Sequence, residues 1–126
     1  MTEPCPFCAA KPDVVLAENS TALAIPDAYP VTEGHSLVIP RKHVASIYHL
    51  SQAEQSEIWT LVAAVRTVLM NQFSVESFNI GFNDGQEAGQ TVMHAHVHIV
   101  PRRIGDVADP RGGIRWVIAD KAAYWK

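Results

Sequence analysis

The chain has 126 residues, of which 48% are hydrophobic and 18% charged, and its formal net charge is −3. These values predict one globular domain over residues 1–126, with a core at about 5–106 and a C-terminal tail at 107–126. The slightly acidic balance argues against a general nucleic-acid or membrane-surface binder. No apolar run approaches the roughly 18 residues of a membrane span and the first residues do not resemble a signal peptide, so we expect a cytoplasmic protein.

Two cysteines lie at positions 5 and 8, in the sequence Cys-Pro-Phe-Cys. Such a pair is a redox motif, half of a zinc site or two unrelated thiols. A thioredoxin-like motif should follow a core strand and open a helix, whereas only four residues precede the first cysteine here. We therefore favour half of a zinc site.

Short apolar runs separated by turn signals predict strands in the N-terminal third. Residues 5–8 and 11–13 have the composition of turns, and the apolar runs at 14–17 and 21–25 predict a hairpin. A third strand is predicted at 35–39, ended by Pro40. A basic turn then leads to residues 44–50, where we expect a short helix.

One long amphipathic helix follows. Ser51 and Glu54 have the spacing of a capping box, in which each side chain bonds to the other residue's backbone amide. Apolar residues then recur every three or four positions as far as Phe73, namely Ile58, Leu61, Val62, Val65, Val68 and Leu69. This apolar stripe is expected to pack on the core or on a second copy of the chain.

A strand with one apolar and one small polar face is predicted next. Phe78, Ile80 and Phe82 alternate with Asn79, Gly81 and Asn83, which is the period of a strand. A turn-rich loop at 84–91 follows, and its Gly89, Gln90 and Thr91 offer neutral hydrogen-bond donors. Such donors can hold a phosphate group.

The run at 94–100 alternates histidine with apolar residues, so it predicts a strand with His94, His96 and His98 on one face. Same-face side chains lie about 6.6 Å apart, close enough to surround a phosphate-sized group. Neighbouring imidazoles repel one another when protonated, which favours neutral rings that act as nucleophiles or metal ligands. One alternative is a strand with a merely polar face, but such a face rarely carries three histidines. Another is a metal site on the triad, and that interpretation must account for the third histidine in the row.

The two C-terminal strands are expected to be antiparallel neighbours. In that arrangement the long helix covers their apolar faces, and Asn83 shares the open face with the three histidines. After Pro101 the chain is polar and rich in turns, and residues 114–118 predict a last short strand.

The histidine run resembles the histidine triad, or HIT, family, whose pattern is His-φ-His-φ-His-φ-φ. The longer string from Asp84 to Arg102 is most similar to the fragile-histidine-triad branch, which hydrolyses dinucleoside polyphosphates. The resemblance implies an α+β, HIT-like fold with a five-stranded antiparallel sheet, one long helix and a shorter one, and a homodimer. It implies an enzyme that cleaves at the α-phosphate of adenine nucleotides through a nucleotidyl-histidine intermediate, with diadenosine polyphosphates as the first substrate class. Adenosine phosphoramidase activity and a non-catalytic AMP-binding sensor are the alternatives.

The resemblance also assigns roles to individual residues. His96 matches the nucleophile, and His98 matches the residue that contacts the phosphate and protonates the leaving group. Asp27 matches the residue that accepts the ribose hydroxyls. The other implied nucleotide contacts are Phe7, Ile25, Asn83, Gly89, Gln90 and Thr91. His35 matches a histidine that supports the site, although a core histidine fits it equally, and His49 reads as a surface residue.

A zinc site is implied by zinc-bearing branches of the same superfamily. There a Cys-x-x-Cys turn joins a histidine after the basic turn and the first triad histidine, which here means Cys5, Cys8, His43 and His94. Four such ligands make a closed structural site that would hold His94, the first member of the catalytic row, away from chemistry. The fragile-histidine-triad branch generally lacks the cysteine pair, so this sequence combines features of two branches. Mg²⁺ is expected only as a companion of a polyphosphate substrate.

Overall fold

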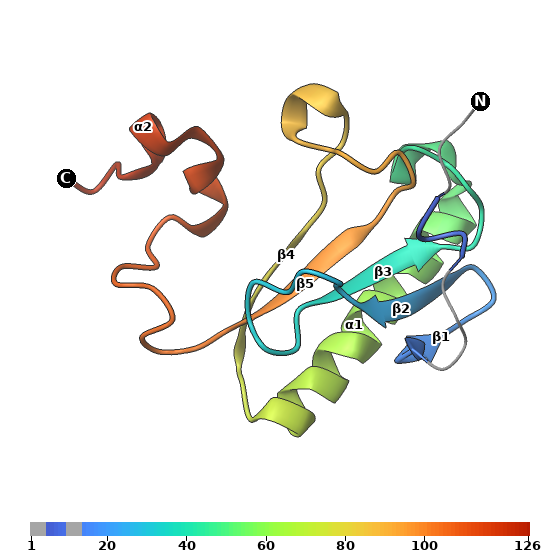
Figure 1. The fold of residues 1–126 in the computed structure, drawn as a ribbon, viewed down its shortest axis with the longest axis horizontal. Coiled ribbons are helices and arrows are strands. Elements are labelled where there is room, and N and C mark those ends of the chain that lie inside the picture. Colours follow the sequence, from blue (N-terminus) through green and yellow to red (C-terminus); the bar gives the residue numbers. More distant parts are fainter. Residues whose placement is uncertain (1–4, 10–13) are drawn as a thin grey trace.

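The computed structural model describes residues 5–9 and 14–126, which form an α+β fold (Figure 1). Five strands make one antiparallel sheet in the order β1-β2-β3-β5-β4, namely β1 (Ala17–Glu18), β2 (Ala22–Pro26), β3 (Ser36–Pro40), β4 (Ser77–Gly81) and β5 (Val97–Arg102). The helices are η2 (Ile47–His49), α1 (Gln52–Phe73), η3 (Gln86–Ala88), η4 (Gly113–Ile118) and α2 (Ala119–Ala122), where η denotes a 3-10 helix. The predicted α+β fold, with a five-stranded antiparallel sheet, one long helix and a shorter one, is confirmed.

Helix α1 begins with the predicted capping box. The Ser51 hydroxyl accepts a hydrogen bond from the backbone amide of Glu54 at 3.1 Å, and the Glu54 carboxylate accepts one from the amide of Ser51 at 2.9 Å. The Lys42 ammonium lies 2.7 Å from the same carboxylate. The helix ends at Phe73 because Ser74 adopts the left-handed conformation, with φ at 54°.

Helix α1 covers one face of the sheet, where the main core forms (Figure 1). Its buried residues are Ile58, Leu61, Val62, Val65 and Leu69, and they pack with strand residues that include Ala22, Ala24, Val38, Val97 and Ile99. Val68, which the periodicity placed on the same stripe, is 45% exposed and lies outside this core. Because one helix covers one face, the opposite face of β2, β3 and β5 remains for other groups.

The N-terminal hairpin is confirmed, with Ala17 opposite Ala24, but β1 is only two residues long. The helix expected at 44–50 is a single 3-10 turn, η2. The predicted turn at 11–13 lies outside the described residues.

The histidine strand is shorter than predicted. The run at 94–100 was expected to be strand throughout, whereas β5 begins at Val97 and His94 and His96 precede it. The β3–β5 ladder stops at the Val38–Val97 pair. Pro40 lies two residues beyond Val38 in β3 and has no amide hydrogen to donate to a further ladder bond. Its carbonyl instead accepts a hydrogen bond from the His94 ring at 2.8 Å. The amide of Ala95 bonds instead to the carbonyl of Val44 at 2.7 Å.

The strand predicted at 114–118 is wrong, since these residues belong to η4. Gly112 and Gly113 both have positive φ, 92° and 45°, and turn the chain immediately before it. Figure 1 shows the segment with η4 and α2 beyond β4, the edge strand of the sheet. Among the described residues, no helix combines the length and the apolar character that crossing a bilayer requires.

Candidate active site and metal centre

The three histidines of the run share the face of the sheet opposite α1. Val97 and Ile99 are fully buried in the core beneath the helix, so the intervening His98 points to the other side. The rings of His96 and His98 are neighbours, with centroids 5.2 Å apart. The ring of Phe7 contacts both His94 and His96, at centroid distances of 5.8 and 4.9 Å.

A backbone carbonyl fixes the tautomer of His96. Its Nδ1 lies 2.8 Å from the carbonyl oxygen of His94. A carbonyl only accepts, so Nδ1 must carry the hydrogen. In a neutral ring the lone pair is then on Nε2. This is the state that a nucleophilic imidazole requires.

The opposite tautomer is fixed in His98, through His35. The backbone amide of Val31 donates to His35 Nδ1 at 3.1 Å, so the hydrogen of the neutral His35 ring is on Nε2. That Nε2–H donates to His98 Nδ1 at 3.0 Å. The hydrogen of the neutral His98 ring must therefore be on Nε2. His96 and His98 thus carry a lone pair and an N–H, respectively, on equivalent ring atoms.

The surroundings of His35 and His98 keep both rings neutral. Burial lowers the pKa of His35 from its usual value, against the opposing charge of Asp27. Burial also lowers the pKa of His98, with further contributions from His96 and His35. The Asp27 carboxylate lies 3.3 Å from His35 Nε2 and 3.9 Å from His98 Nδ1. It holds the pair in place without reversing the effect of burial.

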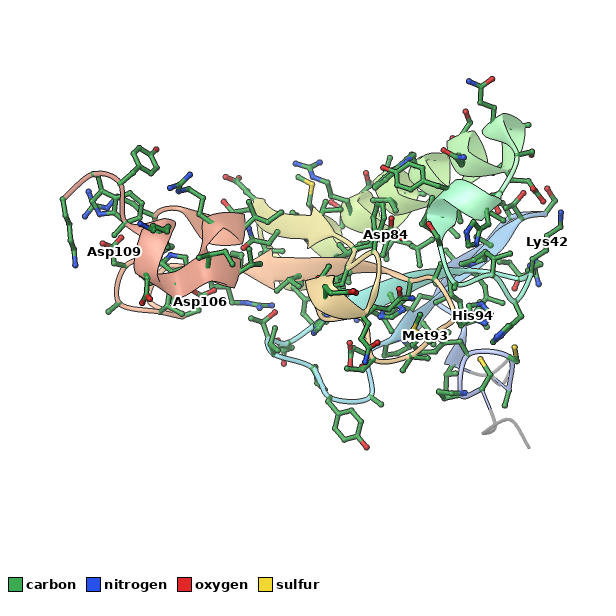
Figure 2. The ribbon with its side chains drawn as sticks, turned by 90° about the horizontal axis from the view of Figure 1, so that it is seen from above. Lys42, Asp84, Met93, His94, Asp106 and Asp109 are labelled. Atoms are coloured by element: carbon green, nitrogen blue, oxygen red, sulfur yellow. The ribbon has the colours of Figure 1, made fainter. Side chains whose placement is uncertain are left out.

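Four potential metal ligands converge beside this row. One ligand atom from each of Cys5, Cys8, His43 and His94 lies within 4.8 Å of all the others. Figure 2 shows His94 beside the turn that carries two sulfur atoms. His94 Nδ1 lies 3.3 Å from Cys5 Sγ and 3.1 Å from His43 Nδ1, and Cys8 Sγ lies 3.2 Å from His43 Nδ1.

These residues fit a tetrahedral ion. Zinc–sulfur and zinc–nitrogen bonds of about 2.3 and 2.0 Å place neighbouring ligand atoms about 3.3–3.8 Å apart. The observed separations are close to that range. The chemistry agrees as well: His94 Nε2 donates to the Pro40 carbonyl at 2.8 Å, so Nδ1 presents a lone pair to the cluster. Four residues that include two thiols can hold a metal ion here.

A second group of potential ligands does not fit a metal. Asp27, His35 and His98 also bring ligand atoms within 4.8 Å of one another. However, His35 Nδ1 accepts from an amide and its Nε2 carries the hydrogen, so neither nitrogen has a free lone pair. Hydrogen bonds account for this cluster without an ion.

An apolar cluster lies on the same face, on the side of β2 and β3. Ile25, Leu37 and Ile39 form a buried cluster there, and Phe7 packs against it. Ile25 is directly opposite Leu37, which is directly opposite His98. The predicted base-pocket residues Phe7 and Ile25 are therefore brought next to the histidine row, with Asp27 just beyond the end of β2.

The loop residues occupy different positions. Asn83 lines a cavity of about 260 Å³ together with His98. Gly89, Gln90 and Thr91 line a separate cavity of about 510 Å³. Gln90 is buried, and its side-chain amide donates to the carbonyls of Ala45 and Val92 while its oxygen accepts from the amide of Gly85. In this structure both Gln90 donors hold the loop together.

Some features of the site have no signal in the sequence. The Val31 amide, which sets the His35 tautomer, is a backbone group in a loop. Gly113 and Ile114, some fifteen residues beyond His98 in the chain, line the cavity beside it. His94, predicted in the catalytic row, has both ring nitrogens directed away from the open face, and its contribution there is the carbonyl that orients His96.

The sequence profile of the HIT domain matches residues 9–105. The chain is 38% identical over 95 residues to the asymmetrical bis(5′-nucleosyl)-tetraphosphatase of Schizosaccharomyces pombe, covering 75% of this chain and 52% of that protein. It is 38% identical over 91 residues to an adenosine 5′-monophosphoramidase of the same organism, covering 72% and 65%. A crystal structure of a HIT family member from Bacillus subtilis aligns with a TM-score of 0.74 at 31% identity, covering 82% of this chain and 77% of that chain.

The chain spans about half the length of the first of these relatives and just under two thirds of the second. Residues 106–126 lie beyond the matched profile.

Proposed function

Because the chain belongs to the HIT domain family, we propose that it hydrolyses or transfers adenine nucleotides at the α-phosphate through a nucleotidyl-histidine intermediate. The observation that carries this proposal is the pair of opposite tautomers in the row: a lone pair on His96 Nε2 beside an N–H on His98 Nε2. A nucleophilic nitrogen and a hydrogen-bond donor for the leaving group thereby lie on adjacent rings.

The proposed reaction has two steps. In the first, His96 Nε2 forms a bond to the α-phosphorus while the bond from phosphorus to the leaving oxygen or nitrogen breaks. The leaving atom accepts a hydrogen bond from His98 Nε2 and takes the proton it needs from solvent water, so His98 stays neutral. In the second, water attacks phosphorus and gives its proton to the solvent, the phosphorus–nitrogen bond breaks, and His96 returns with its lone pair. Phosphoryl chemistry depends mainly on positioning and charge stabilisation, and a rigid row of rings supplies the positioning.

The nucleotide is proposed to lie along the open face. Phe7 and Ile25 belong to the apolar cluster that would receive the base, and the Asp27 carboxylate would accept the ribose hydroxyls. Asn83, Gly89 and Thr91 are proposed to contact the phosphates. Gln90 is proposed to contact the phosphates only after the loop rearranges, since its backbone amide donates to the Gly85 carbonyl at 3.1 Å and its side chain also holds the loop.

Cys5, Cys8, His43 and His94 are proposed to hold a structural zinc ion. When bound, the ion would cross-link the N-terminal turn to the segment that precedes β5. Two contacts would connect this site to the catalytic row. The His94 carbonyl orients His96, and Phe7, which lies between the two cysteines in the N-terminal turn, packs on the His96 ring. Mg²⁺ would arrive only with a polyphosphate substrate.

Diadenosine polyphosphates are the first proposed substrate class, supported by the similarity to the tetraphosphatase. Adenosine phosphoramidates are the second, supported by the similarity to the monophosphoramidase. A homodimer is proposed as the assembly. Light scattering at the concentration used for assays tests the dimer.

Replacement of the nucleophile tests the proposed function. His96→Ala is expected to reduce turnover of both substrate classes by about 10⁴-fold or more while the melting temperature changes little. Turnover equal to that of the wild type would refute the enzyme. If the wild type binds AMP at micromolar concentration but turns over neither class, the non-catalytic nucleotide sensor is the correct reading.

A further inference from the structure

Two sulfur atoms hold the N-terminal turn at residues 5–9 to the rest of the chain. Cys5 Sγ lies 3.3 Å from His94 Nδ1, and Cys8 Sγ lies 3.2 Å from His43 Nδ1. Among the described residues, every hydrogen-bond contact from this turn to another segment uses one of these sulfurs. The other tie is the Phe7 ring, which packs on the apolar cluster. The position of the turn therefore depends on both sulfurs.

The sulfur atoms can be reached from solvent. Cys8 and its neighbour His43 are exposed, and Cys5 is half-buried. Figure 2 shows the turn that carries the sulfurs at the edge of the molecule, beside His94. A thiol that binds a metal ion is deprotonated, and the thiolate is the form that reacts with oxidants. A metal-loaded cluster therefore presents at least one exposed thiolate to small oxidants.

The local backbone allows a bond between the two sulfurs. Cys5 and Cys8 are separated by two residues, and residues 6–9 form a turn. A four-residue turn brings its end Cα atoms within about 7 Å, and a disulfide requires about 4.4–6.8 Å. The Cys8 amide already donates to Cys5 Sγ at 3.3 Å, so the Cys5 side chain points toward Cys8. The chain has two cysteines, so each is the only partner of the other within one chain.

The disulfide and the metal site exclude each other. A tetrahedral ion holds two sulfur ligands about 3.8 Å apart, whereas a disulfide bond is about 2.0 Å long. A sulfur in a disulfide also has no thiolate to offer a metal ion. Oxidation would therefore remove two of the four ligands at once. It would also end the contacts from the turn to His43 and His94.

Phe7 connects the turn to the open face of the sheet. Its ring centroid is 4.9 Å from that of His96, and the ring packs against the cluster that contains Ile25. The tautomer of His96 does not depend on the sulfurs, because His94 is held by the Pro40 carbonyl and holds His96 through its own carbonyl. Release of the turn should therefore weaken the base pocket and leave the histidine row in place.

We propose that Cys5 and Cys8 are a reversible redox switch, in which oxidation by a hydroperoxide expels the metal ion and weakens nucleotide binding through Phe7. This inference rests on the proposed function for the metal ion and for the base that Phe7 contacts.

The oxidation has two steps. The Cys8 thiolate attacks one peroxide oxygen, the oxygen–oxygen bond breaks, and the other oxygen leaves as hydroxide or alkoxide and takes a proton from solvent. The Cys5 thiolate then attacks the sulfur of the Cys8 sulfenic acid and expels hydroxide, which is protonated to water. Two thiolates thus lose two electrons, and one hydroperoxide gains them. A dithiol returns both electrons and restores the two thiols.

Metal release and disulfide formation are measured on the zinc-loaded wild type. Hydrogen peroxide is added in steps, the released zinc is followed with a coloured chelator, and free thiols are counted with a thiol reagent. About one peroxide per ion should release the zinc, with loss of both thiols and a fall of about 2 Da in the intact chain mass. Excess dithiothreitol with zinc should reverse these changes. Zinc that stays bound, or thiols lost without an intramolecular disulfide, would overturn the proposal.

Cys8→His is the matched control. Histidine keeps a metal ligand at this position, so the variant should still bind zinc, but its single thiol has no partner for an intramolecular disulfide. Its zinc should remain bound at the peroxide concentration that empties the wild type. Cys5→His gives the same control from the other cysteine if the first variant loses the metal. Release of zinc from a loaded variant at the wild-type dose would contradict a disulfide as the cause.

Calorimetry with AMP tests the link to the nucleotide. The disulfide form of the wild type should bind AMP about tenfold more weakly than the zinc-loaded form, and reduction with zinc should restore the affinity. Phe7→Ala removes the ring that connects the two sites, so its two forms should differ by less than about twofold while zinc release is unchanged. Trp59→Ala on α1 should keep the tenfold difference. Equal affinities of the two wild-type forms, or a tenfold difference that persists in Phe7→Ala, would overturn the link.

These measurements do not require turnover, because AMP is a product of the proposed reaction and is not consumed. If the wild type hydrolyses neither substrate class while zinc release and the AMP difference hold, the proposed catalysis fails and the switch stands. If turnover is normal and peroxide leaves the zinc in place, the switch fails and the catalysis stands.

Discussion

His35 Nε2 lies 3.0 Å from His98 Nδ1, and this contact determines which nitrogen of His98 carries its hydrogen. His35 is able to donate because its own Nδ1 is occupied by the amide of Val31. A backbone group therefore sets the proton position of a side chain that faces the open site, through one intervening ring. His35 is buried, whereas the His98 side chain is 29% exposed and faces the open site.

Replacing His35 should impair catalysis by releasing His98. His35→Leu removes the donor, and we expect kcat to fall by about 10- to 100-fold, with a smaller change in KM. His35→Gln keeps an acceptor for Val31 and a donor for His98, so it should restore part of the activity and the wild-type pH profile. His49→Leu, at an exposed position, is the control. A uniform loss in the leucine and glutamine variants, with unchanged pH profiles, would indicate a packing role only.

Stability should fall as the solution becomes acidic. Burial lowers the pKa values of His35 and His98, so between their folded values and the usual value near 6.5 the unfolded chain binds more protons than the folded one. Stability contributed by the neutral rings is therefore full above about pH 6.5 and is lost as the pH falls through this window. Urea midpoints for the wild type and His35→Gln test this, since the metal-cluster histidines are common to both. The variant should show the weaker dependence, and identical slopes would contradict the expectation.

Removing a cluster cysteine should release the metal without touching the catalytic row. Cys8→Ser is expected to lower the zinc content from about one ion per chain to a small fraction, and to lower the melting temperature. His96→Ala should retain its zinc, because His96 is not among the four ligands. Elemental analysis of both purified variants gives the comparison. Loss of the metal from His96→Ala with retention in Cys8→Ser would place the ion on the histidine row instead.

The capping box of α1 should contribute to stability and not to activity. Ser51→Ala removes the side chain that accepts from Glu54, and we expect the free energy of unfolding to fall by about 1 kcal/mol. Ser56→Ala, at an exposed position within the helix, should cost less. Turnover by both variants should match the wild type, because α1 covers the face opposite the histidines. A larger activity loss in Ser51→Ala would show that the helix start is coupled to the site.

Much of the sheet and helix pattern could be predicted from the sequence because local periodicity and burial agree there. The alternation of Val97 with His98 reports which face is buried, and the capping box marks where α1 begins. In β4 the alternation predicts the strand but not its burial, because Ile80, expected beneath the helix, is 37% exposed. The residue at which the histidine strand begins could not be predicted from local periodicity. It depends on Pro40, a residue distant in the chain that cannot continue the ladder.

The C-terminal segment shows the second limit. Ile114 and Ile118 have the composition of a strand, but two glycines with positive φ turn the chain before them. Its position against Asn79 depends on contacts between distant segments, which periodicity does not report. The tautomers of the row likewise depend on backbone partners that become visible only in the folded chain.

The most direct measurement of the central claim is the site of a trapped covalent intermediate. Substrate labelled in its adenosine moiety is mixed with excess enzyme, the reaction is stopped within one turnover, and the labelled peptide is identified by mass spectrometry. The account predicts the nucleotidyl group on Nε2 of His96, absent from His96→Ala and slower to form in His98→Ala. A nucleotidyl group on another residue, or full turnover by His96→Ala, would contradict it.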